Sequence, residues 1–252
     1  MSNQTMYEQN VYFPDVFKGC KHNCVYCKPS FQRQAKRQKQ RCGKCYTFEP
    51  HLHVERLTRK APATHGNQFV FFPKGGDLRF ATYWEVKKLL AYIRANSRTT
   101  FMSQSKDPSF WRSHVPLPAN LIIGVTLETH QRYFDTRGGA YPEYFNISDA
   151  PVPMQRFGSF RSIEHNRKGI TIEPILQFKL PTMVSWITSL KPEFVYIGYD
   201  TKKCNLPEPT LAETLALIDA LEKAGLDVRK KTIRTAWYET ALNLTQDARG
   251  KQ

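Results

Sequence analysis

The sequence predicts an α/β fold, a partial (β/α)6 TIM-like barrel, from three observations. Its 252 residues fall close to the roughly 200–250 residues that a single barrel domain often has. Apolar residues make up 40% of the chain and charged residues 23%, a balance that permits a buried core. After about residue 65, short apolar runs alternate with stretches of helical periodicity. Because repeated βα units form parallel sheets, we expect the functional site at the C-terminal strand ends.

Six short runs predict the strands of this sheet. Most are nearly continuous in apolar character, as in parallel strands that are covered on both faces. The expected strands are 11–17, 68–73, 99–104, 121–127, 169–176 and 193–198.

Four helices are expected between and after these strands. Thr82 and Glu85 have the spacing of a capping box at the start of one helix, and Thr210 and Glu213 repeat it at the start of another. Gly225 is a typical residue just past the end of the second helix. Further helices are expected at 153–167 and 181–190.

The chain 1–252 is expected to be one domain with a basic, Cys- and His-containing insertion at about 28–65. We call this segment the basic insertion. A second irregular stretch, 134–153, is rich in Gly, Pro and Tyr and is expected to be a long loop over the mouth of a site.

The charge of the chain is strongly positive, with 37 Lys and Arg residues against 22 Asp and Glu residues. A net charge of +15 favours a polyanionic partner such as RNA or DNA. The alternative for the basic insertion is an ordinary solvated surface. No apolar run is long enough to span a membrane and no secretion signal is evident, so we expect a cytoplasmic protein. Ten of the basic residues lie within the insertion: Lys28, Arg33, Lys36, Arg37, Lys39, Arg41, Lys44, Arg56, Arg59 and Lys60.

Five of the six cysteines lie within 26 positions, which is more typical of metal binding than of disulfides in a chain without a secretion signal. Cys20, Cys24 and Cys27 have the spacing C-x3-C-x2-C. Three thiolates on a short loop can hold three irons of a cubane cluster and leave the fourth iron open. Cys204 stands apart and is expected to have no such role.

Two other groupings use the same cysteines. Cys24 and Cys27 with Cys42 and Cys45 form two C-x2-C pairs separated by fourteen residues, a pattern typical of a zinc ribbon. That grouping predicts a nucleic-acid-binding protein without catalysis. A third grouping places Cys42, Cys45, His51 and His53 on a separate zinc ion; otherwise these are ordinary thiols and exposed histidines.

The cysteine spacing, with Tyr26 just before the third cysteine, resembles the signature of the radical SAM superfamily. Over about residues 10–210 the chain is also similar to a short phage and archaeal branch without large accessory domains. The segments that carry this likeness are PHLHVERL, GVTLET, SDAPVPMQRF, TIEPIL and LPEP. The resemblance implies that Cys20, Cys24 and Cys27 hold a [4Fe-4S] cluster, which reductively cleaves S-adenosylmethionine (SAM). A hydrogen atom is then taken from a substrate.

The resemblance also implies a SAM site. The superfamily usually has a Gly-Gly-Glu motif that receives the amino group of the SAM methionine. This chain has Gly75, Gly76 and Asp77 at that place, and it departs from the motif because Asp77 has a shorter side chain than Glu. Polar side chains at the positions of Thr126 and Glu128 would bind the ribose and the methionine end of SAM. The adenine would lie beside Tyr26 and meet the backbone around Ile197 and Tyr199.

Glu173 lies within an apolar strand. A carboxylate there either pairs with a basic residue or faces the cavity, and we favour the cavity.

The expected partners follow from charge and from the resemblance. A nucleic acid or nucleotide is the favoured substrate, with Arg137, Arg156 and Arg161 as further phosphate contacts; a peptide or a small metabolite is the alternative. A flavodoxin or ferredoxin would supply electrons. No catalytic residue is identified, although Lys106, Tyr133, Arg137, Arg156, Tyr199 and Asp200 lie at suitable positions.

Overall fold

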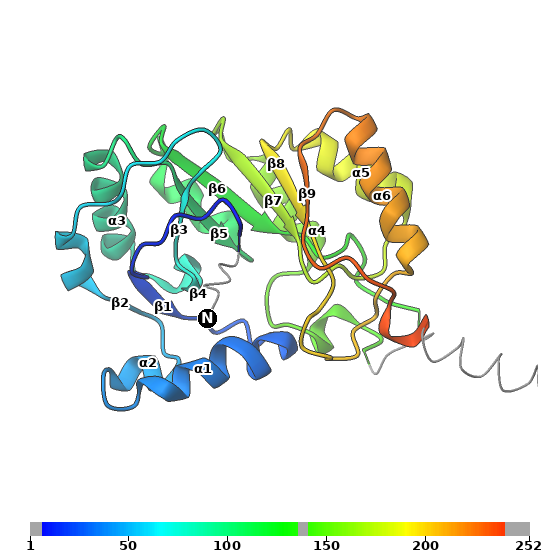
Figure 1. Cartoon of the computed structure of the whole chain (residues 1–252), viewed down its shortest axis with the longest axis horizontal. Helices are drawn as coiled ribbons and strands as arrows, with labels where there is room; N and C mark the ends of the chain where they lie inside the picture. Colours follow the sequence, from blue (N-terminus) through cyan, green and yellow to red (C-terminus); the bar gives the residue numbers. More distant parts are fainter. Residues whose placement is uncertain (1–6, 136–140, 240–252) are drawn as a thin grey trace, which may run out of the picture.

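The computed structural model describes residues 7–135 and 141–239. Its main feature is a curled, six-stranded sheet that forms half of a barrel, with the strand order β3-β5-β6-β7-β8-β9 and every pair parallel (Figure 1). The strands are β3 (Val70–Phe71), β5 (Phe101–Ser105), β6 (Leu121–Thr126), β7 (Lys168–Ile172), β8 (Phe194–Ile197) and β9 (Val228–Lys230). Five of the six predicted strands are therefore members of this sheet.

The first predicted strand is the exception. The chain forms β1 only at Phe17–Gly19, and β1 belongs to a separate small sheet, where it pairs antiparallel with β2 (His51–Leu52) and parallel with β4 (Gly75–Gly76). The sixth strand of the large sheet is instead β9. Its sequence, Val-Arg-Lys, has no apolar run because β9 is an edge strand whose residues are half-buried or exposed.

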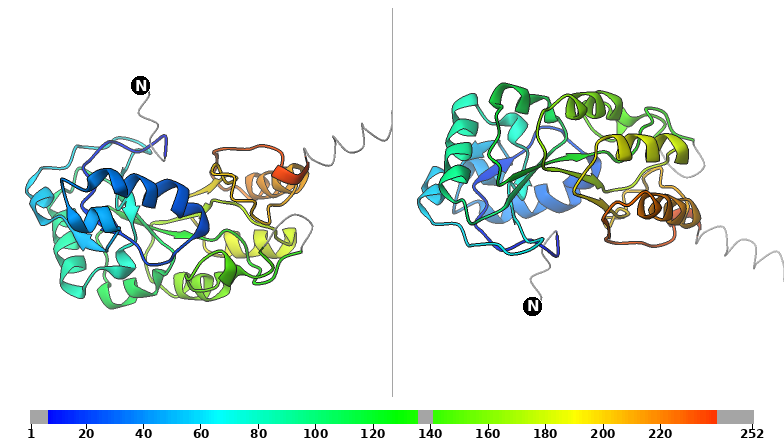
Figure 2. Two further views of the ribbon diagram at one scale, coloured as in Figure 1. Left: turned by 90° about the horizontal axis from the view of Figure 1, so that it is seen from below. Right: turned by 90° about the horizontal axis from the view of Figure 1, so that it is seen from above.

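Four long helices cover the outer side of the curved sheet (Figures 1 and 2). In α3 the Thr82 side chain accepts the amide of Glu85 at 3.3 Å, and the Glu85 carboxylate accepts the amide of Thr82 at 2.7 Å. The same capping box, between Thr210 and Glu213, begins α6. The helices are α3 (Tyr83–Ala95), α4 (Pro153–Arg161), α5 (Leu180–Ser189) and α6 (Leu211–Lys223), so all four predicted helices are present.

Apolar side chains cover both faces of the sheet. Alternate residues of one strand point to opposite faces, so Phe101 and Ile123 lie in the large core under the helices. Their neighbours Met102 and Ile122 lie in a second cluster on the other face, which Tyr7 also joins. This two-sided burial explains why β6 and β8 are nearly continuous in apolar residues.

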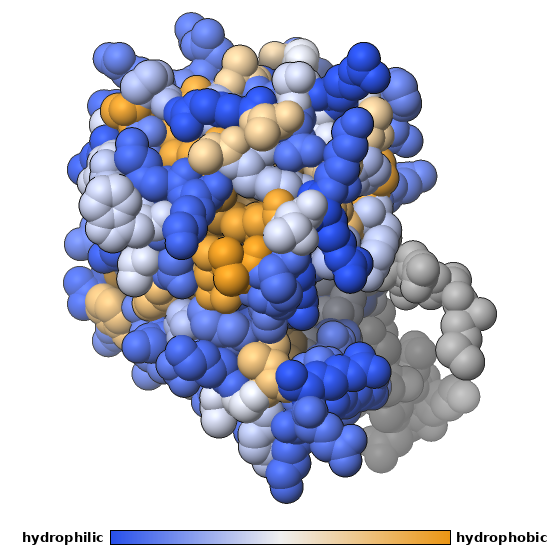
Figure 3. Space-filling model, turned by 90° about the vertical axis from the view of Figure 1, so that its left-hand side faces the viewer, coloured by the Kyte–Doolittle hydropathy of each residue, from blue (hydrophilic) through white to orange (hydrophobic). Residues whose placement is uncertain are grey.

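The basic insertion lies partly on the side of the molecule away from the long helices, where residues 28–47 run, and partly beside α3, where the Tyr92 hydroxyl donates to the Arg59 carbonyl at 2.8 Å (Figures 1 and 2). It consists of short helical turns, among them α1 (Arg33–Ala35) and α2 (Gly43–Thr47), followed by β2. Nine of its ten basic side chains are exposed, and only Arg56 is half-buried. The molecular face drawn in Figure 3 is mostly hydrophilic, with a hydrophobic area near its middle.

No helix among the described residues is long and apolar enough to cross a membrane.

Candidate functional site

A cavity lies at the carboxyl ends of the strands, where the sequence predicts the site. Residues that follow or end β1, β3, β5, β6 and β7 line it, together with side chains from the basic insertion. Of the predicted site residues, the lining includes Cys20, Cys24, Tyr26, Cys27, Gly75, Gly76, Asp77, Thr126 and Glu173.

The three cysteines share a loop that begins directly after β1. This loop is held by the segment 141–152: the Val25 amide donates to the Ile147 carbonyl at 2.9 Å, and the Asp149 amide donates to the His22 carbonyl at 2.8 Å. The Ser148 hydroxyl lies 3.1 Å from the Cys24 sulfur. The predicted loop at 134–153 therefore packs on the cysteine loop, although residues 136–140 lie outside the described residues.

The three thiols differ in acidity. A hydrogen bond from Cys27, assisted by the nearby Lys106 cation, holds the pKa of Cys24 well below its usual value despite burial. The same hydrogen bond and burial raise the pKa of Cys27, whereas burial and the negative charge of Asp77 raise the pKa of Cys20. Ionising all three thiols together is therefore costly unless a positive metal centre neutralises them.

Behind Tyr26 lies a buried network centred on Glu128. The Glu128 side chain is fully buried and ion-paired to two cations, Lys106 on one oxygen and Arg156, at 2.7 Å, on the other. The hydroxyls of Tyr26 and Tyr144 donate to the first oxygen at 2.8 and 3.1 Å. Although burial alone would raise the pKa of Glu128, the two cations hold it well below its usual value.

Arg156 was expected to meet phosphate, and the structure corrects this. Its side chain is fully buried, with Nη1 bonded to Glu128 and to the Thr126 carbonyl, so it cannot reach a polyanion at the surface. Lys106 is likewise buried, and it also bonds the Tyr26 hydroxyl. Arg137 lies outside the described residues, whereas Arg161 and Tyr133 are exposed.

The Gly75-Gly76 strand lies directly beside β1. A Cβ atom at Gly76 would come within 2.8 Å of the Gly19 carbonyl oxygen, so a glycine permits this close approach. Both backbone amides at the start of the turn, Lys74 and Gly75, donate to the Asp15 carboxylate at 2.9 Å.

Asp77 is occupied by partners within the chain. Its carboxylate accepts the Ser105 hydroxyl at 2.6 Å and the backbone amides of Lys106 and Arg79 at 2.9 Å, and it lies 3.2 Å from His22. These contacts give Asp77 a structural role, in addition to any contact with a ligand.

The remaining predicted SAM residues fall into two groups. Thr126 lines the cavity and accepts the Gln104 side-chain amide at 2.6 Å. Glu173 lines the cavity, as favoured from the sequence, and it also pairs with a basic residue, Lys231, which was the alternative. The side chains of Ile197 and Tyr199 are instead fully buried in the core and do not line the cavity, and the Ile197 carbonyl already accepts the Lys231 amide at 2.8 Å.

Sequence reasoning missed His22 and Gln104. His22 lies between two of the cysteines, and its ring belongs to a group with Cys20 and Asp77 whose ligand atoms lie within 4.8 Å of one another. Its place inside the C-x3-C spacing was a usable signal. Gln104 lines the cavity from the end of β5, where it lies between Ser103 and Ser105, and nothing in that polar run distinguishes it from its neighbours.

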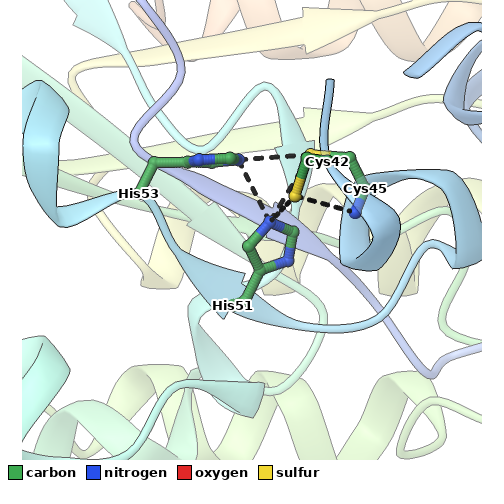
Figure 4. Close-up of side chains that lie close together, drawn as sticks. All are labelled: Cys42, Cys45, His51 and His53. Atoms are coloured by element: carbon green, nitrogen blue, oxygen red, sulfur yellow. Dashed lines mark hydrogen bonds between the residues drawn. The ribbon is translucent and has the colours of Figure 1, made fainter. Parts of the chain in front are cut away.

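A second group of soft ligands lies in the basic insertion and can bind a metal ion: Cys42, Cys45, His51 and His53 have their ligand atoms within 4.8 Å of one another (Figure 4). Burial lowers the pKa of His53, which favours the neutral form that binds metals. The zinc-ribbon prediction is therefore wrong, because Cys24 and Cys27 do not lie with Cys42 and Cys45 around one point. Cys24 and Cys27 line the cavity with Cys20, whereas Cys42 and Cys45 meet the two histidines.

Comparison with protein-family models, curated proteins and solved structures finds no match to the chain.

Proposed function

We propose that the chain is a radical SAM enzyme that binds its [4Fe-4S] cluster through Cys20, Cys24 and Cys27. In this proposal the curled sheet is a partial TIM-like barrel, and the cavity at its strand ends receives SAM. One observation carries the proposal: three cysteines with the superfamily spacing line one cavity together with Gly75 and Gly76, at the carboxyl ends of parallel strands.

The donor set fits the cluster chemically. Thiolates are the ligands of iron–sulfur clusters, and three of them leave one iron available to a further ligand. The cavity also supplies a buried cation, Lys106, beside the most acidic thiol, Cys24. When bound, such a cluster supplies the electron that breaks a sulfur–carbon bond of SAM.

The chain's own residues would bind SAM and exclude water from it. Tyr26 offers an aromatic ring at the cavity wall, and the Glu128 network fixes that ring by its hydroxyl. Glu173, paired with Lys231, can accept hydrogen bonds from ribose hydroxyls or from an ammonium group. Segment 141–152 packs over the cysteine loop and limits the access of water.

A nucleic acid is the substrate class that the surface supports best. A second hollow adjoins the candidate cavity and shares Phe31, Phe48, Lys74 and Gly75 with it. Its lining combines basic and aromatic side chains, the two features by which proteins hold single-stranded nucleic acids. Besides the shared residues, Lys18, Arg56, Arg59, Tyr12 and Phe13 contribute to it.

The cluster is tested by anaerobic reconstitution with iron and sulfide, followed by metal and sulfide analysis. We expect about four irons and four sulfides per chain in the wild type and in the control Cys204→Ala, whose cysteine lies elsewhere. Cys24→Ala should retain less than a tenth of this iron. A wild type that binds no iron, or a Cys24→Ala variant that binds as much as the wild type, would overturn the proposal.

A further inference from the structure

We infer that Cys42, Cys45, His51 and His53 bind one structural zinc ion, which joins α2 of the basic insertion to β2, the strand that pairs with β1 just before the cysteine loop. The zinc assignment is independent of the proposed function; only its consequence for the candidate cavity rests on that function.

The spacing of the four ligand atoms matches a tetrahedral site. With Zn–S near 2.3 Å and Zn–N near 2.0–2.1 Å, a tetrahedron has N–N edges of about 3.3 Å and S–N edges of about 3.6 Å. The Nε2 atoms of His51 and His53 are 3.1 Å apart. The His51 Nε2 atom lies 3.5 Å from the Cys42 sulfur and 3.4 Å from the Cys45 sulfur, and the His53 Nε2 atom lies 3.2 Å from the Cys45 sulfur. All four atoms therefore surround one point (Figure 4).

Hydrogen bonds hold both imidazole rings in the orientation that a metal requires. The Nδ1 atom of His51 lies 2.7 Å from the Glu49 carbonyl oxygen, and the Nδ1 atom of His53 lies 3.1 Å from the Glu55 carboxylate. Nδ1 is therefore the protonated nitrogen in each ring, and both Nε2 lone pairs are directed at the shared point. Two lone pairs 3.1 Å apart repel one another unless a cation lies between them.

The chemistry of the donors selects the ion and its role. Two thiolates and two imidazoles suit zinc, whereas Mg²⁺ and Ca²⁺ prefer oxygen ligands. Four protein ligands complete a tetrahedron and leave no position open for a substrate, which is the mark of a structural site. Burial agrees, because Cys45 is 5% and His53 8% exposed.

The ion would lie where it can fix one wall of the candidate cavity. His51 is in β2, which pairs with β1, and the register sets His51 opposite Lys18. Gly19 follows at φ +91°, and a Cβ atom there would lie 2.3 Å from the Glu49 carbonyl group. The backbone between Cys45 and His51 thus packs on Gly19, the residue that precedes Cys20. Phe48, in the same stretch, lines the cavity itself.

The experiment is zinc quantitation on the full chain, purified after growth with added zinc. We expect about one zinc per chain in the wild type and in two controls, Cys24→Ala and Cys204→Ser. The double variant Cys42→Ser/Cys45→Ser should keep less than a tenth of it. Zinc that persists in the double variant, zinc that is lost in Cys24→Ala, or a wild type without zinc would each overturn the inference.

A second measurement covers the case in which the double variant fails to fold. Wild-type chain is stripped of zinc with a chelator and titrated with Co²⁺, and we expect the visible absorption of tetrahedral, thiolate-bound cobalt to saturate at about one equivalent. Added zinc should abolish that absorption. Octahedral, nearly colourless cobalt would refute the site even if the variants are uninformative. Because Cys24→Ala removes the proposed cluster and not the zinc, failure of one proposal is distinguishable from failure of the other.

Discussion

Glu128→Gln should destabilise the chain strongly, because Glu128 is fully buried and is the only carboxylate of its network among the described residues. In the wild type the Glu128 oxygens are bonded to Lys106, Arg156 and the hydroxyls of Tyr26 and Tyr144. Glutamine keeps the size of the side chain but leaves the buried Arg156 without its counterion, while Lys106 retains only Cys24 as an anionic neighbour. Breaking a buried ion pair from one side costs roughly 3–5 kcal/mol.

The assay is urea unfolding followed by tryptophan fluorescence at pH 7. A loss of about 4 kcal/mol, with a slope of about 2–3 kcal/mol per M, lowers the midpoint by about 1–2 M urea. The matched control is Glu193→Gln. Glu193 also pairs with an arginine, at 2.7 Å from Arg167, but both side chains are about one-third exposed, so its loss should cost less than about 1 kcal/mol.

The pH dependence gives a second test of the same network. The folded pKa of Glu128 is lowered, so its contribution to stability is complete above its unfolded pKa, near 4.5, and is lost as pH falls through the folded value. The stability gap between wild type and Glu128→Gln should therefore be constant from about pH 6 to 8 and should narrow below about pH 4.5. A Glu128→Gln variant within 1 kcal/mol of the wild type at pH 7, or a gap that widens in acid, would refute the reasoning.

Three further predictions follow from other residues. Gly19→Ala should lower the unfolding free energy by at least about 2 kcal/mol, since its positive φ alone costs about 1–2 kcal/mol and the new Cβ meets the Glu49 backbone; Gly158→Ala, with open space around it, should be neutral or slightly stabilising. Tyr12→Ala should weaken single-stranded RNA binding by about tenfold through lost stacking, whereas Trp84→Ala, equally exposed at 72% but outside both hollows, should change it less than twofold. Replacing four exposed cations of the basic insertion, Lys36, Arg37, Lys39 and Arg41, with Gln should reduce the slope of log RNA affinity against log salt concentration by about 3. An unchanged slope would show that these four side chains do not contact the RNA.

Local sequence patterns predicted most of the fold. The helices α3 and α6 begin at capping boxes that consist of two residues three apart, so a short window contains the whole signal. The strands β6 and β8 are almost entirely apolar because both faces of the sheet are buried, whereas β5 begins with two apolar residues and ends in Ser-Gln-Ser. By contrast, β1 and β9 depend on their partners: β1 is short and pairs with β2 and β4, which lie far along the chain, and β9 is polar at the sheet edge.

The candidate site divides in the same way. The cysteine spacing and the Gly75-Gly76 pair are local, and the structure places them around one cavity. The partners of Glu128 could not be predicted, because Arg156 is 28 positions away in α4 and no local pattern links it to a residue that follows β6. For Cys42 and Cys45 the sequence allowed two sets of partner ligands, Cys24 with Cys27 or His51 with His53. The turn into β2, which places the two histidines beside Cys42 and Cys45, decides between them.

The most direct test of the central proposal is the reductive cleavage of SAM by the anaerobically reconstituted chain. With dithionite as the reductant, we expect the wild type and Cys204→Ala to form 5′-deoxyadenosine and methionine, measured by liquid chromatography with mass detection. Cys24→Ala should form less than a hundredth of the wild-type amount while keeping its zinc. If the wild type, loaded with iron and sulfide, forms no 5′-deoxyadenosine above the Cys24→Ala background, the radical SAM function is contradicted.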